Sequence, residues 1–513
     1  MNDQLPAIIV LAPMFGALLV SLVGNRDHRI CFPVALVSLV ISMGAAIAAT
    51  QQVFTSGPID YFMGGWEKPL GIGIQLRIDA LNSLVLLAIG TVSILVAFFS
   101  IRRVGEQNTE KTPQFYVLYL LLCVGLFGIT ITGDAFNLFV LIEISSLTSY
   151  GLVAMGSSRR GTHAAFNYVI MGTVGASFYL IGVGYLYMKT GSLNMMDIRT
   201  ILASNAEVAD SSAVTIAFLF ILVGIWIKMA FFPLNGWLPN AYSYCPSSSA
   251  CILAPLMTKV SVYVMIRVMI SVFGLDWIFS NAGWSELVVW LAVIAIMAGS
   301  IFALAQREIK KMLCYLIVAE VGYMVGGAWL ADDGWWGLTG SIYHILADAM
   351  MTLCLFLSAG IFARRFNAVE ISDLEGLFKR APWTSVGFVI GALAMIGVPP
   401  TCGFYSKFYL IRGGIDAGQW QFVAALLISS LVNAVLFFRI FEIAHFGNKP
   451  AEGHNQEDHS REKITPQDGP WTALVPLLTA AAIIILLGLF NGQIVELIRV
   501  ALDDLPPMAA NFK

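Results

Sequence analysis

Four ionisable side chains lie within apolar runs long enough to cross a membrane: Glu143, Lys228, Lys259 and Lys407. A charge in the hydrocarbon core costs about 3 kcal/mol or more, so each needs a reason to be there. Lysine suits proton transfer because desolvation lowers its pKa and a nearby carboxylate raises it. Moving Glu143 toward or away from Lys228 would bind or release a proton. A permanent ion pair joining two spans would use the same two residues, and the sequence leaves both interpretations open.

Proline residues interrupt two spans close to these lysines. The segment Phe-Phe-Pro-Leu-Asn-Gly-Trp breaks one span at Pro233, just after Lys228. The segment Gly-Val-Pro-Pro-Thr-Cys-Gly breaks another at Pro399 and Pro400, just before Lys407. Broken helices beside buried charges recur where transporters handle ions. We therefore expect both breaks to be functional, with a proline kink of no function as the alternative at either one.

The composition is that of a polytopic, all-α membrane protein. The chain has 513 residues, of which 58% are hydrophobic and 12% are charged, and its mean hydropathy is +0.79. Apolar runs of about 20 residues predict about fourteen transmembrane helices in a lipid bilayer. The net charge of -3 gives no sign of nucleic-acid binding. Seven cysteines without metal-ligand spacing, and no Gly-rich nucleotide loop, predict neither a metal site nor a cofactor.

The distribution of basic residues predicts the topology. Loops on one side of the membrane hold most of the Lys and Arg residues, among them Arg102, Arg103, Lys310 and Lys311. By the positive-inside rule this side is cytoplasmic. The sequence therefore predicts that both termini lie on the outer side of the membrane, which for the inner membrane of a bacterial cell is the periplasmic side.

The two proline breaks also predict an internal repeat. They fall five spans apart, in the spans expected at 213–234 and 382–410, and a shift of five spans inverts the topology of one copy relative to the other. Spans four to eight (113–272) and nine to thirteen (285–446) are therefore expected to form an inverted pair of five-helix repeats. The rest divides into N-terminal helices one to three (1–112), a cytoplasmic loop (447–470), and the last helix with a short tail (471–513).

Other ionisable groups occupy the same spans. Glu320 and Asp348 are acidic counterparts of the buried lysines. His344 and Asp348 can extend a wet path, although each alone is typical of a hydrogen bond between helices. Arg267 and Arg439 lie nearer to span ends, where a long side chain reaches the membrane surface, so we expect them to snorkel.

These motifs resemble a known family. The pattern from Lys228 through Pro-Leu-Asn-Gly-Trp-Leu-Pro to Lys259 and Arg267 is similar to the proton-translocation signature of antiporter-like subunits. Such subunits occur in respiratory complex I, membrane-bound hydrogenases and Mrp-type multisubunit Na+/H+ antiporters. The agreement extends to Phe-Asn-Leu-Phe-Val before Glu143 and to Gly-Val-Pro-Pro before Lys407, so it covers nearly the whole chain.

The resemblance implies roles for the buried charges. Glu143 and Lys228 would form the coupled pair, Lys259 the central relay, and Lys407 the group nearest the outlet. It also implies fourteen helices with inverted five-helix repeats, protons and Na+ as transported ions, and other membrane subunits as partners.

Within the family, the D subunit of Mrp-type antiporters fits best. Asn235 and Tyr242 stand where complex I subunits usually carry His. The alternatives are an antiporter-like subunit of a complex I-like NADH-quinone oxidoreductase or membrane-bound hydrogenase, and a structural subunit with an interrupted proton path. The chain itself is expected to hold no catalytic site.

One segment departs from the family pattern. Where many relatives read His-Leu-Leu-Asn-His-Ala-Leu-Phe-Lys, this chain has His344, then Asp348 in place of the second His, and Thr352 in place of the Lys. The relay from Lys259 to Lys407 is then expected to run through His344 and Asp348 with water. The alternative is that it is interrupted here.

Overall fold

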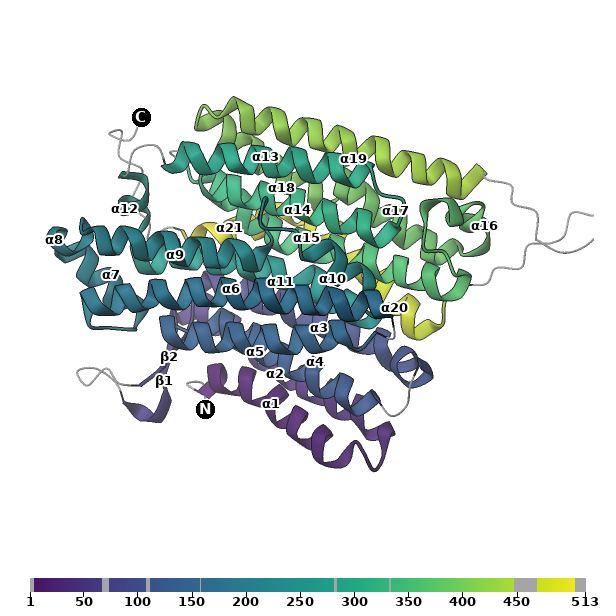
Figure 1. The fold of residues 1–513 in the computed structure, drawn as a ribbon, viewed down its shortest axis with the longest axis horizontal. Coiled ribbons are helices and arrows are strands. Elements are labelled where there is room, and N and C mark those ends of the chain that lie inside the picture. Colours follow the sequence, from purple (N-terminus) through teal and green to yellow (C-terminus); the bar gives the residue numbers. More distant parts are fainter. Residues whose placement is uncertain are drawn as a thin grey trace, which may run out of the picture.

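The computed structural model describes most of the chain and is almost entirely helical (Figure 1). The described residues are 4–66, 73–107, 111–156, 158–280, 284–331, 334–446 and 468–502. The predicted loop 447–470 therefore lies outside the described residues except for its last three positions.

The helices that form the transmembrane bundle, including two broken ones, follow one another along the whole described chain. They are α1 (Leu5–Val23), α2 (Cys31–Ser56), α3 (Ala80–Gln107), α4 (Thr112–Ile131), α5 (Ala135–Ala154), α6 (Arg159–Thr190), α9 (Ser212–Met229), α10 (Leu238–Tyr244), α11 (Ser247–Val268), α13 (Trp284–Leu304), α14 (Ile309–Ala328), α15 (Trp336–Phe366), α17 (Pro382–Ile396), α18 (Cys402–Asp416), α19 (Trp420–Phe446) and α20 (Trp471–Leu489). Short helices lie between or after them: α7 (Met195–Ser204), α8 (Ala206–Ala209), α12 (Leu275–Ser280), α16 (Leu377–Arg380) and α21 (Asn491–Val500).

The predicted class of fold is confirmed. Thirteen helices within the described residues are long and apolar enough to cross a membrane. The remaining predicted span, 382–410, is divided between α17 and α18 because Gly-Val-Pro-Pro interrupts it. Polar caps set some of the helix starts: the Asp134 side chain accepts a hydrogen bond from Asn137 N at 2.6 Å where α5 begins.

Both predicted helix breaks are present. The helix α9 ends at Met229, Ala230 takes a left-handed conformation (φ 58°), and α10 resumes at Leu238. In the second break, Gly397 (φ 94°) ends α17 and α18 begins at Cys402. Each break contains a cis X–Pro peptide bond, Phe232–Pro233 in one and Pro399–Pro400 in the other.

The two breaks sit in similar packing environments. In the first half α6 packs along α9, and in the second half α15 packs along α17 and α18. The sequence predicted the break near 233 but not the short helix α10 beyond it, because seven residues are too few to read as a span.

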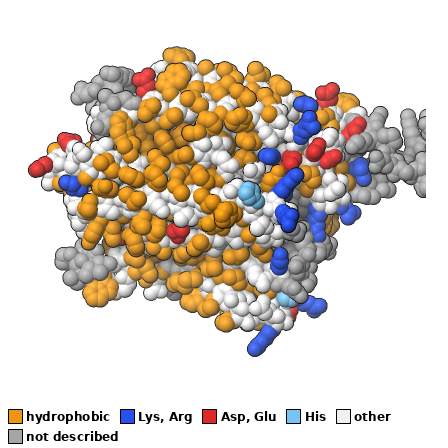
Figure 2. Space-filling model, in the orientation of Figure 1, with side chains coloured by type: hydrophobic (Ala, Val, Ile, Leu, Met, Phe, Trp, Pro, Cys, Tyr) orange, Lys and Arg blue, Asp and Glu red, His pale blue; other side chains and the backbone are white. Residues whose placement is uncertain are grey.

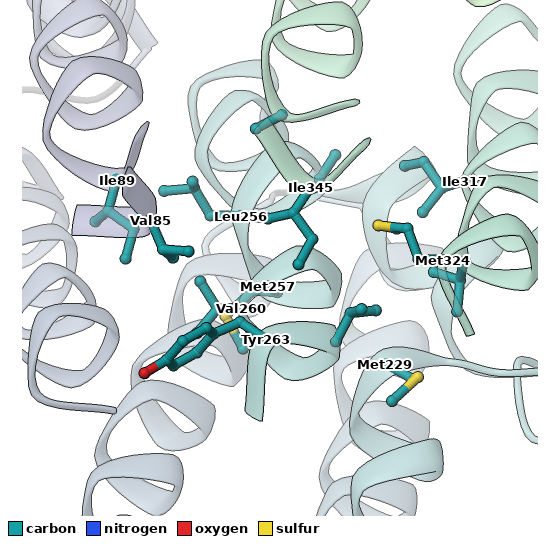
Figure 3. Packing of buried hydrophobic residues seen from close by; sticks show 14 of the residues in the cluster. Val85, Ile89, Met229, Leu256, Met257, Val260, Tyr263, Ile317, Met324 and Ile345 are labelled. Atoms are coloured by element: carbon teal, nitrogen blue, oxygen red, sulfur yellow. The ribbon is translucent and has the colours of Figure 1, made fainter. Parts of the chain in front are cut away.

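The most buried helices lie at the centre of the bundle. The most apolar stretch of α15 is entirely buried, and α14 and α11 come close to it. Figure 3 shows Leu256, Met257 and Val260 of α11 between Val85 of α3 and Ile345 of α15. Polar residues on α11, α14 and α15 are therefore held in a packed and largely apolar setting, which makes their hydrogen-bond partners decisive.

A small β-hairpin lies at one end of the bundle. Strands β1 (Ile59–Phe62) and β2 (Gln75–Ile78) pair antiparallel, with Ile59 opposite Ile78 and Phe62 opposite Gln75. The sequence did not predict this hairpin. It matters because Asp79, directly after β2, is held against the bundle.

Charged side chains are unevenly distributed over the ends of the molecule. Figure 2 shows Lys and Arg gathered at one end of a broad hydrophobic band, on the right in that view. The hairpin, the start of α1 and α21 lie at the opposite end (Figure 1). The first and last described residues therefore both lie at the end of the bundle that has few basic residues. The side of the membrane that this end faces stays a prediction.

Candidate functional site

The first acid–base pair joins α5 to α9 and is partly buried. Lys228 Nζ lies 3.4 Å from Glu143 Oε1 and donates a hydrogen bond of 2.7 Å to Ser146 Oγ. The Lys228 side chain is 10% exposed and that of Glu143 is 26% exposed. The sequence predicted this partnership, and the structure brings the two residues together.

The position of Lys228 follows from local structure. Lys228 lies in the last turn of α9, where free backbone carbonyls favour a positive charge. Close packing against α6 fixes the helix, since a Cβ added at Gly224 would lie 2.6 Å from the carbonyl oxygen of Gly175. The helix break thus ends α9 one residue beyond the lysine and places its ammonium at a helix C-terminus.

A small cavity adjoins Lys228 on the side of α11. Its volume is about 20 Å³, and the lining residues with polar side chains are Ser145, Ser146, Tyr179, Lys228 and Ser261. A cavity needs roughly 10 to 15 Å³ and several polar partners to hold one water molecule. This cavity therefore has room and partners for a water between α9 and α11.

The second buried pair joins α11 to α15. Lys259 Nζ lies 2.9 Å from Asp348 Oδ2, and the two side chains are 1% and 0% exposed. Thr352 Oγ1 accepts from Lys259 Nζ at 3.3 Å and donates to Asp348 Oδ1 at 2.7 Å. The two residues that depart from the family pattern, Asp348 and Thr352, thus both bind Lys259, which also donates to the carbonyl oxygen of Ala254 at 3.2 Å.

A third pair, Glu320 and His344, joins α14 to α15. His344 Nε2 lies 2.5 Å from Glu320 Oε2, and Nδ1 lies 2.8 Å from Ser406 Oγ. Ligand atoms of Glu320, His344 and Asp348 all lie within 4.8 Å of one another, so the third pair is continuous with the second. One cation can reach all three, but Glu320 already contacts His344 and Asp348 already forms an ion pair with Lys259.

The fourth cation is held differently. Lys407 Nζ donates to the Met395 carbonyl at 2.7 Å and to Ser430 Oγ at 3.2 Å. The ammonium also lies 5.1 Å from the centre of the Tyr323 ring, a cation–π contact, and that ring packs edge-on against His344 at 5.6 Å. Lys407 thus lies next to the His344–Glu320 pair, with the Tyr323 ring in contact with both Lys407 and His344. Backbone carbonyls at the end of α17, and not a carboxylate, bind its ammonium.

Most of the predicted site residues are brought together. Lys259, Asp348, His344 and Lys407 form one connected cluster, and Glu143 and Lys228 lie across the small cavity from α11. Glu320 was noted only as a buried acid, although its position on the most buried face of α14 makes it the partner of His344. Its signal in the sequence is an acid within an otherwise apolar span.

The expectation that Arg267 snorkels is wrong. Arg267 Nη1 and Nη2 lie 2.6 Å and 2.8 Å from the two carboxylate oxygens of Asp79. The hairpin places Asp79 beside the end of α11, so the guanidinium is paired inside the bundle and does not extend to the surface. Arg439 on α19 is exposed, consistent with snorkelling.

A helical membrane bundle with two broken helices and a series of buried acid–base groups is typical of ion-transporting proteins. Comparison with known proteins gives the family: residues 132–433 match the model described as NADH:quinone oxidoreductase/Mrp antiporter, TM. The chain belongs to this family.

Relatives and a solved structure match almost the full length. The chain is 40% identical to NADH-quinone oxidoreductase subunit N of Desulforudis audaxviator, covering 97% of this chain and 98% of that one. It is 30% identical to the Na(+)/H(+) antiporter D subunit of Bacillus subtilis, covering 96% and 95%. In structure it resembles a chain of the archaeal membrane-bound sulfane sulfur reductase, with a TM-score of 0.87, 27% identity and coverage of 99% of both chains.

Proposed function

We propose that this chain is the proton-translocating subunit of a multisubunit monovalent cation/proton antiporter. The observation that carries the proposal is the series of buried acid–base groups contributed by α5, α9, α11, α14, α15 and α18. Replacing a whole buried ion pair by apolar side chains of similar volume is often neutral or stabilising, so retaining several such pairs favours a use beyond stability.

The first step is proton binding at the Glu143–Lys228 pair. At 3.4 Å the ion pair is long, and Ser146 holds the ammonium at the shorter distance of 2.7 Å. Lys228 therefore keeps a hydrogen-bond acceptor when Glu143 moves away, so the carboxylate can withdraw and weaken proton binding without stranding the lysine. This is how a shift of one helix relative to another changes proton affinity at the site.

The second step passes the proton from Lys228 to α11. The cavity between α9 and α11 has room for one water, and Ser261 provides a hydroxyl on the far side. Lys259 lies on the same helix and is paired with Asp348, so arrival of a proton near Lys259 weakens that pair.

The third step runs from Lys259 toward Lys407. Asp348 lies within reach of both Lys259 and the Glu320–His344 pair. Imidazole relays a proton by accepting on one ring nitrogen and donating from the other, and the ring of His344 connects Glu320 with Ser406, the neighbour of Lys407. These contacts favour a continuous path past Thr352 over an interrupted one.

Na+ is the cation that we propose is exchanged, and other membrane subunits are the proposed partners. The relative from Bacillus subtilis, named as part of a Na(+)/H(+) antiporter, supports both. The five-part division of the chain, with inverted repeats at 113–272 and 285–446, and the periplasmic placement of both termini belong to the same proposal.

A second candidate function is the equivalent subunit of a quinone-reducing complex. The 40% identity to a relative named NADH-quinone oxidoreductase subunit N favours it. Purification of the chain with its native partners separates the two: peripheral flavin and iron–sulfur subunits in the preparation would exclude the antiporter assignment.

The proposal is tested with the native complex in proteoliposomes, by following proton flux driven by a Na+ gradient. We expect Glu143→Gln and Lys228→Ala each to reduce the flux severely, with the complex shown intact by size-exclusion chromatography. Lys189→Ala, an exposed lysine in the last turn of α6, is the matched control and should leave the flux unchanged. Near-normal flux in both site variants would overturn the proposal and favour a structural subunit.

A further inference from the structure

The hairpin end of α11 is closed by a two-point salt bridge. Arg267 Nη1 and Nη2 bind the two oxygens of Asp79, and Arg267 Nε donates to Tyr263 Oη at 2.9 Å. The Arg267 side chain is 11% exposed and that of Asp79 is 18% exposed. Asp79 Oδ1 also accepts from Asn82 N at 3.1 Å, which fixes the carboxylate at the start of α3.

The hydroxyl of Tyr263 both donates and accepts a hydrogen bond in this network. It donates to the carbonyl oxygen of Thr130 at 2.7 Å while it accepts from Arg267. The same carbonyl accepts from Asn82 Nδ2 at 3.1 Å, so both of its lone pairs are engaged. The single hydroxyl proton of Tyr263 is therefore committed to the Thr130 carbonyl.

The network lies between Lys259 and the surface at the hairpin end. Lys259, Tyr263 and Arg267 are spaced four residues apart and so share one face of α11. At 1.5 Å per residue, Arg267 lies about 12 Å along the axis from Lys259. Beyond it Asp79 lies 3.9 Å from Arg77, and Arg77 lies 3.3 Å from Asp60, which is 37% exposed. The chain of ion pairs that leads inward from Asp60 therefore ends at Arg267, on the face of α11 that carries Lys259.

We propose that Arg267, held by Asp79, is a proton barrier that closes Lys259 off from the hairpin side of the membrane. The proposal rests on the proposed function, since it presumes that Lys259 carries protons. A guanidinium does not give up its proton, so a hydrogen-bonded chain stops there. Its fixed positive charge also repels hydrated cations, as pore-lining arginines do in channels. Lys259 then exchanges protons only within the membrane, toward the Lys228 cavity and Asp348.

A barrier and a purely structural salt bridge predict different proton leaks. If the pair only joins the hairpin to α11, removing either partner should have the same effect. If Arg267 is a barrier, Arg267→Gln removes the positive charge and allows protons to leak through. Asp79→Asn leaves the charge of Arg267 in place, so passive proton entry should stay low.

The experiment measures passive proton entry into proteoliposomes that contain the assembled complex, under a K+/valinomycin potential and without a Na+ gradient. We expect Arg267→Gln to increase proton entry severalfold over the wild type and Asp79→Asn to leave it near the wild-type rate. Arg267→Lys keeps an ion pair but has a proton to release, so its leak should be intermediate. This variant serves as the test if the Gln variant does not assemble. Equal leaks in the Gln and Asn variants, or none in either arginine variant, would overturn the barrier.

A second-site variant shows whether the leak uses the proposed path. Adding Lys259→Met to Arg267→Gln should return proton entry to the wild-type rate, and a leak that persists would overturn the proposal. The single variant Lys259→Met distinguishes failure of the proposed barrier from failure of the proposed function. If it abolishes Na+-driven flux while Arg267→Gln does not leak, the barrier fails and the proposed function stands. If it leaves that flux unchanged, the proposed function itself fails.

Discussion

The ammonium of Lys259 lies 2.9 Å from the carboxylate of Asp348, and both side chains are buried at the centre of the membrane bundle. Each residue therefore determines the cost of burying the other. We expect Asp348→Asn to destabilise the chain by about 3 kcal/mol, because an uncompensated lysine remains in an apolar setting. Thermal unfolding of the detergent-solubilised complex measures this loss.

The control for Asp348 is the double variant Lys259→Met with Asp348→Leu. Replacing a buried ion pair by apolar side chains of similar volume is often neutral or stabilising. The double variant should therefore unfold at or above the wild-type temperature and yet not transport protons. If it regains flux along with stability, the pair has only a structural role.

Glu320 and His344 should act as one unit. We expect Glu320→Gln or His344→Gln to reduce proton flux by about tenfold or more, equivalent to about 1.4 kcal/mol on the barrier. Because each is the other's partner at 2.5 Å, the double variant should be no slower than the slower single variant. Glu442→Gln, an exposed acid on α19, should leave flux unchanged. Multiplicative losses in the double variant would show that the two residues act independently.

Close packing of α6 against α9 should control the position of Lys228. A Cβ at Gly224 would lie 2.6 Å from Gly175 O and 2.8 Å from Tyr179 N, so Gly224→Ala must push the helices apart. We expect a loss of about 1 to 3 kcal/mol in stability, as for overpacked cores, and lower flux. The control is Gly184→Ala on α6, where an added Cβ meets nothing within 4 Å and helix propensity improves. Equal effects of the two substitutions on unfolding temperature would contradict the packing argument.

The salt bridge at the hairpin end predicts a pH dependence of stability. Burial raises the pKa of Asp79. The charge of Arg267 and the hydrogen bonds from Arg267 and Asn82 together lower it by more than burial raises it, so the pKa lies below its ordinary value. A carboxyl whose pKa is lower in the folded state stabilises the fold fully above its unfolded pKa of about 3.9. That contribution is lost as the pH falls through the folded pKa.

We therefore expect the wild type to unfold at a higher temperature than Asp79→Asn at pH 6, and this difference to shrink below about pH 4. Unfolding temperatures of both proteins over this pH range, followed by intrinsic fluorescence, provide the measurement. A difference that grows on acidification would have the wrong sign for this pair.

The sequence was most informative about features that neighbouring residues in the chain determine. Apolar runs and prolines can be read directly from the sequence, and both act on the local backbone. The spans and the breaks at Pro233 and Pro399 were therefore predictable. The partnership of Glu143 with Lys228 was also predictable, because few charges share the spans. Which faces of α14 and α15 meet depends on how the whole bundle packs, and so Glu320 was not assigned to His344.

The salt bridge of Asp79 with Arg267 shows the opposite case. Asp79 stands at the very start of the apolar run expected at 78–101, and it follows a strand of only four residues, too short to read from the sequence. Without the hairpin, an arginine near a span end is most simply explained by snorkelling. Only the three-dimensional position of the hairpin end reveals that Arg267 has a buried partner.

Lys407 donates hydrogen bonds to the end of α17, and so its protonation state can affect the helix break there. The ammonium donates to the carbonyl of Met395, to which Asn433 of α19 also donates at 3.2 Å, and at 3.4 Å to that of Ile396. In the proposed function Lys407 gives up a proton and then has two hydrogens for the three acceptors that its ammonium binds. One carbonyl at the end of α17 would then need water or another donor as its partner. If Lys407 carries protons as proposed, its charge and the angle of the helix at this break are coupled, and the gain or loss of a single proton would change the bend.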